Sequence, residues 1–179
     1  MNHQKLYRLV LAALFAALCY VATNIIHVPI PATDGYINLG DCVVLLGAFL
    51  LGPVYGAAAG GIGSALADIL SGYTIFAPGT FVIKALIAVF AALILKALSG
   101  KTKLAAVLAA VVGEIWMVLG YFLYESIFLG YGLAAAGSIG GNTIQAVAGI
   151  ILSVALYAVL WNGVVLAAGE LAGPSPAFE

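Results

Sequence analysis

Long runs of apolar residues, separated by short stretches of glycine, proline and polar residues, account for almost the whole chain. The pattern predicts helices at about 5–27, 36–51, 54–70, 81–98, 104–129 and 142–166. A helix needs about 20 residues to cross a bilayer, so the second segment is short for a span. We predict an all-α membrane protein, a bundle of six transmembrane helices.

Helix-breaking residues separate these segments. Pro29 and Pro31 end the first helix, because proline lacks a backbone donor and restricts the residue before it. Gly52 and Pro53 predict a tight turn between the second and third helices. Loops are expected at 28–35, 71–80, 99–103 and 130–141.

The composition excludes a soluble protein. Of the 179 residues, 65% are hydrophobic and 7% are charged, whereas a soluble domain carries about 25% charged residues. The mean hydropathy is +1.20. We therefore expect one membrane domain at 1–168, a flexible cytoplasmic tail at 169–179, and no space for a soluble catalytic domain. The sequence lacks a basic patch of the kind that would indicate binding to nucleic acid.

Neither the cysteines nor the N-terminal segment indicates a reactive or metal-binding site. Cys19 and Cys42 lie in apolar runs, outside any Cys-x-x-Cys pair, so we expect buried thiols, no metal and no cofactor. Lys5 and Arg8 before an apolar run also fit a signal peptide. No convincing cleavage site follows, and Leu18 before Cys19 fits a lipoprotein site poorly. We predict a retained first helix.

The basic residues predict the orientation. With six spans, five of them fall on one side of the membrane: Lys5, Arg8, Lys96, Lys101 and Lys103. The positive-inside rule makes that side cytoplasmic, with both termini, and places the loops at 28–35, 71–80 and 130–141 outside.

Polar residues gather toward the predicted outer half of the bundle, with Glu114 nearer mid-membrane. An ionisable residue inside a membrane is by default a functional-site hypothesis, and a channel would need polar groups along its whole depth. We expect a closed-bottomed cup instead. The candidate substrate-binding residues are Tyr36, Asn38, Asp41, Asp68, Lys84, Glu114, Tyr121, Glu125, Asn142 and Gln145.

The charges in this cup allow two interpretations. Lys84 is expected to pair with Asp41 or Asp68, since a lone buried charge is costly. The carboxylates either bind ligand or only hold helices together. The acidic and amide groups suit a neutral or cationic ligand rich in hydrogen-bond donors, and tyrosines offer faces for a planar ring. Each aromatic residue is also explained by packing or by an interfacial belt.

Enzyme signatures are missing from the sequence. No phosphate-binding Walker loop is present. The stretch 61–65 resembles a serine elbow only faintly, because the second glycine is absent. We expect no catalytic residues.

Small residues form two notable patterns. Gly52, Gly56, Gly60, Ser64 and Asp68 recur every four residues and predict a helix face that a neighbour can approach closely. The first helix carries two overlapping small-xxx-small pairs, Ala12/Ala16 and Ala13/Ala17. These alanines serve either packing within the chain or docking of another protein.

Four stretches together resemble a known family. They are GYINLGD at 35–41, GPVYG at 52–56, GSALADILSGY at 63–73 and TFVIKAL at 80–86. They are similar to the substrate-binding S components of energy-coupling factor (ECF) vitamin transporters. The resemblance runs from the first to the sixth predicted helix, but it is specific at 35–86, and the last two helices match only in layout.

The resemblance implies an S-component bundle in a bacterial plasma membrane that binds a vitamin or precursor from outside. It also implies that the loop between the first two helices covers the ligand, and that Ala12, Ala13, Ala16 and Ala17 dock a transmembrane coupling (T) subunit. Two ATPase subunits would supply energy while the S component topples to release its ligand. Related members bind riboflavin, pyridoxine-like compounds, hydroxymethylpyrimidine or queuosine-type bases. The acidic and amide groups favour a nitrogen heterocycle with donor groups.

Two other functions remain open. A stand-alone secondary carrier would be expected to show an internal repeat, and the halves 1–90 and 91–179 show none. A membrane enzyme or a structural subunit is the third possibility. Copurification with ATPase subunits would distinguish the S component from both.

Overall fold

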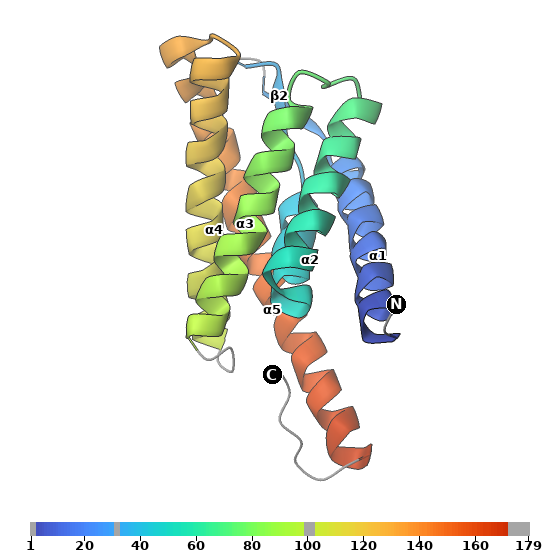
Figure 1. The fold of residues 1–179 in the computed structure, drawn as a ribbon. Helices are drawn as coiled ribbons and strands as arrows, with labels where there is room; N and C mark the ends of the chain where they lie inside the picture. Colours follow the sequence, from blue (N-terminus) through green and yellow to red (C-terminus); the bar gives the residue numbers. More distant parts are fainter. Residues whose placement is uncertain (1–2, 31–32, 99–102, 172–179) are drawn as a thin grey trace.

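The computed structural model describes residues 3–30, 33–98 and 103–171 as a bundle of long helices topped by a small β-hairpin (Figure 1). The long helices are α1 (His3–Ile25), α2 (Gly40–Leu70), α3 (Ala77–Ala97), α4 (Lys103–Leu123) and α5 (Ile139–Leu171). Within these ranges, five helical segments are long and apolar enough to cross a membrane. The all-helical membrane architecture is confirmed.

Helix α2 is bent back on itself at Gly52, whose φ of 77° and ψ of −175° lie outside the helical region. A Cβ on Gly56 would lie 2.9 Å from the Cα of Ala48, and one on Gly60 would lie 2.9 Å from Val44 Cγ1. Residues eight apart on a straight helix are separated by about 12 Å. The predicted helices 36–51 and 54–70 are therefore antiparallel arms of one element, joined by the predicted Gly52-Pro53 turn.

The segment before α2 differs from the prediction. A helix beginning at Tyr36 is wrong: β1 (Val28–Ile30) pairs antiparallel with β2 (Gly35–Ile37), with Pro29 opposite Tyr36, and α2 begins at Gly40. The physical reason lies in Asn38, whose Oδ1 accepts a hydrogen bond of 2.8 Å from the Gly40 amide. Such local side-chain bonds offer the backbone an alternative to the helix. The expected loop at 28–35 is thus largely a hairpin.

Other boundaries shift by a few residues. Helix α3 begins at Ala77 and takes Pro78 into its first turn, where the missing amide costs nothing. Helix α4 continues as a π-helix (Tyr124–Phe128), and a 3-10 helix (Gly132–Ser138) occupies most of the loop expected at 130–141. Helix α5 runs through Leu171, while the rest of the predicted tail lies outside the described residues.

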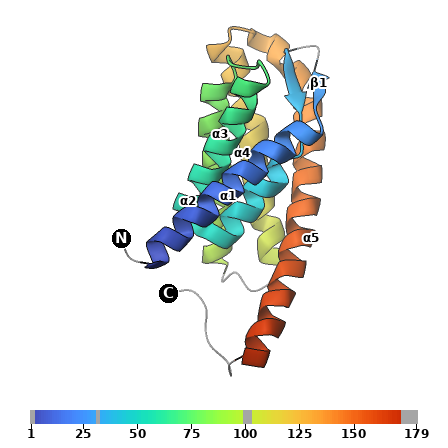
Figure 2. The same cartoon turned by 90° about the vertical axis from the view of Figure 1, so that its right-hand side faces the viewer.

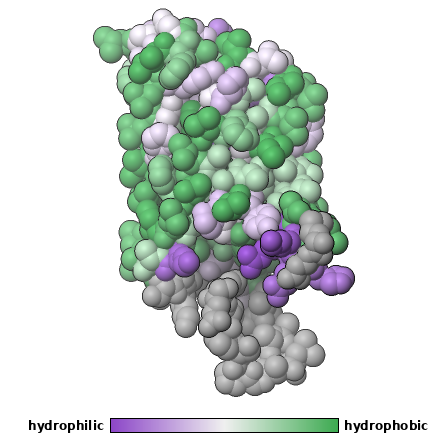
Figure 3. All heavy atoms as spheres, viewed as in Figure 1, coloured by the Kyte–Doolittle hydropathy of each residue, from purple (hydrophilic) through white to green (hydrophobic). Residues whose placement is uncertain are grey.

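Small residues set the packing of the bundle. Ala88 and Ala91 on α3 and Ala106 and Ala109 on α4 are fully buried, which lets helices approach closely. Helix α1 crosses α2 obliquely (Figure 2). The face seen in Figure 3 is mainly apolar, and strongly hydrophilic residues gather near its lower edge, at the end of the bundle where α1 starts.

Candidate functional site

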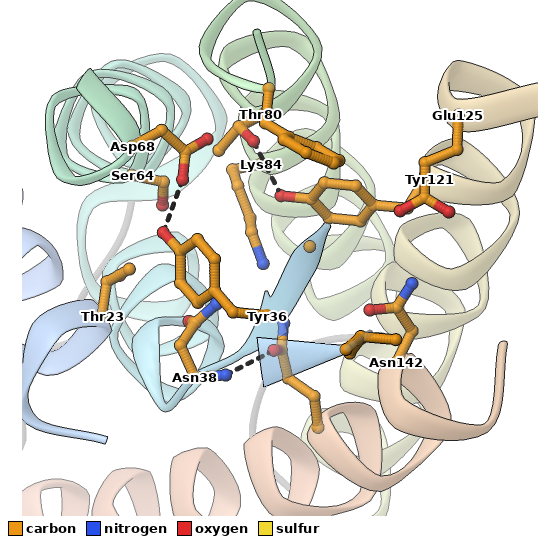
Figure 4. A pocket seen from close by; sticks show the side chains of 14 residues that line it. Thr23, Tyr36, Asn38, Ser64, Asp68, Thr80, Lys84, Tyr121, Glu125 and Asn142 are labelled. Atoms are coloured by element: carbon orange, nitrogen blue, oxygen red, sulfur yellow. Dashed lines mark hydrogen bonds between the residues drawn. The ribbon is translucent and has the colours of Figure 1, made fainter. Parts of the chain in front are cut away.

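A polar cavity lies beneath the β-hairpin, where all five long helices and the hairpin contribute to its wall (Figure 4). It contains about 430 Å³ of space free of protein atoms, including its opening to solvent. Eight of the ten predicted substrate-binding residues line it: Tyr36, Asn38, Asp68, Lys84, Tyr121, Glu125, Asn142 and Gln145. Residues spread over more than a hundred positions thus meet in one place.

An ion pair lies at the floor of this cavity. The Lys84 ammonium binds Asp41 Oδ1, and both side chains are about 1% exposed. The other carboxylate oxygen of Asp41 accepts a hydrogen bond of 2.5 Å from Gln145 Nε2. Of the two partners considered for Lys84, the structure selects Asp41, which lies just behind the cavity wall. A buried pair needs such extra hydrogen bonds to offset its desolvation.

The same glutamine connects the floor to the hairpin. Gln145 Oε1 accepts a hydrogen bond of 2.7 Å from the Asn38 amide, which directly follows β2. The amide of Gln145 therefore joins α5, the hairpin and the start of α2. This arrangement fixes the height of the hairpin above Lys84.

A second carboxylate, Asp68, lies on the opposite wall. Its Oδ1 accepts a 2.5 Å hydrogen bond from the Tyr36 hydroxyl, whereas Oδ2 is buried without a hydrogen-bond partner among the described residues. Burial is the main cause that raises the pKa of Tyr36 far above its usual value, and the nearby Asp68 carboxylate raises it further. The phenol therefore stays protonated and keeps donating, and Asp68 keeps one oxygen for another donor.

Aromatic rings close the mouth on this side. His27 stacks on Tyr36 with ring centroids 3.6 Å apart, and the Tyr73 ring lies 4.6 Å from that of Tyr36. Burial lowers the pKa of His27, although Asp68 acts in the opposite direction. The rings connect the hairpin to the α2–α3 loop.

The remaining wall combines an aromatic face with a third carboxylate. The Tyr121 hydroxyl lies 3.0 Å from Thr80 Oγ1, and its ring centroid lies 5.4 Å from Lys84 Nζ. Glu125 Oε2 accepts a 2.6 Å hydrogen bond from Ser138. A ligand here would meet a ring face, an ammonium donor and carboxylate acceptors.

Two predicted residues lie outside the wall. Asp41 supports the wall from behind through Lys84 and Gln145, whereas Glu114 lies deeper in the bundle. Sequence reasoning also missed six lining residues: Thr23, Ile30, Gly35, Ser64, Phe76 and Thr80. Ser64 lies on the recognised small-residue face and Thr80 in a recognised stretch, but small and apolar side chains carry no signal of their own.

The four alanines of α1 divide between two environments. Ala12 is 8% exposed and Ala16 is half-buried, while Ala13 and Ala17 are exposed. The carbonyl of Ala16 lies directly against Gly63 of α2, where no Cβ would fit. One small-residue pair therefore packs inside the chain, and the other faces outward.

The described residues contain no group of three or more His, Cys, Asp or Glu side chains that could hold a metal ion. Both cysteines are free and buried, and Cys19 Sγ lies 3.2 Å from the cavity-lining Ser64.

Comparison with known proteins supports the resemblance seen in the sequence. A family model for the ECF-type riboflavin transporter, S component, matches residues 3–162. A protein of Pyrococcus woesei described as uncharacterized is 41% identical over 132 residues, which cover 74% of this chain and 86% of that protein. The solved structure of the S component of a bacterial ECF transporter matches with a TM-score of 0.73, at 23% identity, over 89% of this chain and 98% of that one.

The structural likeness shows a shared fold, and the family match covers nearly the whole chain. The predicted S-component fold is thus confirmed, whereas the six spans and the cytoplasmic termini stay predictions. The chain belongs to the family of ECF-type riboflavin transporter S components, the substrate-binding membrane subunits of ECF transporters, and it is not an enzyme.

Proposed function

We propose that the cavity beneath the β-hairpin captures a vitamin-like nitrogen heterocycle from outside the cell. The observation that carries this proposal is the convergence of eight polar or aromatic candidates on one cavity whose floor is an ion pair. Below that floor, Leu45, Ile87 and Ala91 are fully buried. An apolar core there supports a capture site that holds its ligand and lacks a through-route.

Riboflavin is the first ligand to test, because the matching family model is named for it. Pyridoxine-like compounds, hydroxymethylpyrimidine and queuosine-type bases are the alternatives. Asp68 Oδ2 is ready to accept from an N–H or O–H group, and Lys84 is placed to donate to a carbonyl or ring nitrogen. The Tyr121 ring supports a planar ligand by stacking.

The proposed topology has six spans with both termini in the cytoplasm. The two arms of α2 would each count as a span, joined by a turn at Gly52. The cavity lies beneath the β-hairpin. Helix α1, whose first turns carry Lys5 and Arg8, begins at the end of the bundle opposite the hairpin (Figure 1). This separation agrees with a cytoplasmic N-terminus under the positive-inside rule. The membrane is the plasma membrane, in which the chain is surrounded by lipid.

The proposed partners are a transmembrane T subunit and two ATPase subunits, which would supply energy for release of the ligand. The exposed face of α1 at Ala13 and Ala17 supports docking of a helix, because small residues allow close approach. Ala12 and Ala16 lie on the inner side of the same helix, which packs against α2.

Capture is tested by native mass spectrometry of the gently purified protein, followed by titration with riboflavin, pyridoxine, hydroxymethylpyrimidine and a queuosine-type base. We expect one of them to bind one molecule per chain. Asn142→Leu should weaken this binding about tenfold or more, because Asn142 lines the cavity. The matched control Thr143→Leu, on the exposed side of α5, should not.

If both variants bound ligand as tightly as the wild type, the ligand site would lie outside this cavity. Copurification with ATPase subunits would support the S-component assembly. Uptake by the isolated protein in liposomes would instead support a stand-alone secondary carrier.

A further inference from the structure

Glu114 is the buried acidic residue that the capture site does not use. It lies in the middle of α4, is 1% exposed, and does not line the cavity. Neither of its carboxyl oxygens has a hydrogen-bond partner among the described residues. Asp41 differs, because each of its oxygens binds a donor.

Within the described part of the chain, the cation that acts on Glu114 is Lys84, which is already paired. From α2, Asp41 and Cys42 face Glu114, and from α3, Lys84 does so. From α5, Gly149 lies against Glu114 and carries no titratable group. Lys84 is bound to Asp41, so the region holds two carboxyl groups and one ammonium.

Gly149 of α5 packs closely against both acidic residues. A Cβ at this position would lie 3.1 Å from Asp41 Cβ and 3.1 Å from Glu114 Oε1. The absence of a side chain thus lets Asp41 and Glu114 both lie against the same point of α5. A second buried carboxylate beside Asp41, without a cation or donor of its own, would be uncompensated in the membrane interior.

We propose that Glu114 is a proton-binding site: it carries its proton permanently and serves as the reserve partner of Asp41. While Lys84 pairs with Asp41, the protonated Glu114 side chain makes no hydrogen bond with the described residues. When a group in the cavity draws the ammonium away, the Glu114 O–H donates to the freed Asp41 carboxylate beside Gly149. The proton stays between the two oxygens, so no proton enters or leaves the protein.

Infrared spectroscopy of the purified, ligand-free protein tests the site without relying on the proposed function. We expect a protonated-carboxyl carbonyl band that persists from about pH 5 to pH 8, shifts when glutamate is labelled with carbon-13, and disappears in Glu114→Gln. The control Glu125→Gln should retain it. A labelled wild-type spectrum without any shifted band in this region would overturn the proton site, even if Glu114→Gln failed to fold.

The reserve role is tested in Lys84→Met, which removes the cation without any ligand. We expect this variant to fold and its Glu114 band to shift to lower frequency, as the acid bonds to Asp41. Combining it with Gly149→Ala should reverse the shift, whereas Gly140→Ala, where a Cβ meets nothing within 4 Å, should not. An unshifted band, or a Lys84→Met variant that cannot fold, would overturn the reserve role. Ligand capture could still succeed or fail independently of either result.

Discussion

Asp41 at the start of α2 and Lys84 on α3 form an ion pair that is about 1% exposed, directly below the cavity. Removing one partner of a buried pair leaves an uncompensated charge. We expect Asp41→Asn to lower the free energy of unfolding by about 3–5 kcal/mol, together with ligand affinity. Thermal unfolding in detergent measures the first effect. Lys96→Ala, an exposed cation on the same helix as Lys84, is the control, and equal stability of both variants would contradict a structural ion pair.

The hydrogen bond between Tyr36 and Asp68 fastens the hairpin to the cavity wall. Tyr36→Phe keeps the ring stack but removes the donor. A hydrogen bond to a charged group contributes about 1.5–3 kcal/mol, so we expect ligand to dissociate roughly tenfold to a hundredfold faster. Stopped-flow measurement of ligand release checks this. Tyr7→Phe, on the exposed surface of α1, should release ligand at the wild-type rate.

The His27–Tyr36 stack makes the hairpin sensitive to acid. Burial lowers the pKa of His27, so the folded protein binds this proton less readily than the unfolded chain. The free energy of unfolding should therefore fall as the pH drops below about 6.5, the usual value for histidine. Melting curves between about pH 7.5 and pH 5.5 should show the loss. His27→Phe, which keeps a ring, should reduce it, and His3→Gln should leave it unchanged.

The alanines of α1 should separate stability from docking. Ala12→Leu forces volume into a buried position and should destabilise the protein by about 1–3 kcal/mol. Ala13→Leu lies on the exposed face and should leave folding and ligand binding intact while blocking uptake by the assembled transporter. Uptake assays and ligand binding by the two variants measure these effects. Normal uptake by Ala13→Leu would contradict a docking role for this face.

Much of this architecture follows from patterns that act locally. The apolar runs predict the helices, and the Gly52-Pro53 pair predicts the reversal because no ordinary helix accommodates it. The recurrence of polar residues near one end of several helices was enough to bring Lys84, Asp68 and Gln145 together. These features depend on spacing along the chain, which the sequence displays directly.

Other features depend on contacts between distant segments. Lys84 pairs with Asp41 and not with Asp68, and the other oxygen of Asp41 accepts a hydrogen bond from Gln145, more than a hundred positions away. The β-hairpin was missed because Pro29 and the short strands resemble a loop, and its pairing depends on Asn38 diverting the backbone. Likewise, only packing against Gly63 distinguishes the two alanine pairs of α1.

The reversal at Gly52 makes the lengths of the two arms of α2 part of the site. Asp41 is 11 residues before Gly52 and Asp68 is 16 residues after it, so at a rise of about 1.5 Å per residue Asp68 lies about 7–8 Å farther from the turn. The positions of the floor and of the wall above it therefore depend on arm length as much as on residue identity. One residue inserted in the second arm would rotate Asp68 by about 100° and advance it by about 1.5 Å, turning it off the cavity wall although every side chain remained. The length of the two arms of α2 is therefore as much a determinant of the site as the acids they carry.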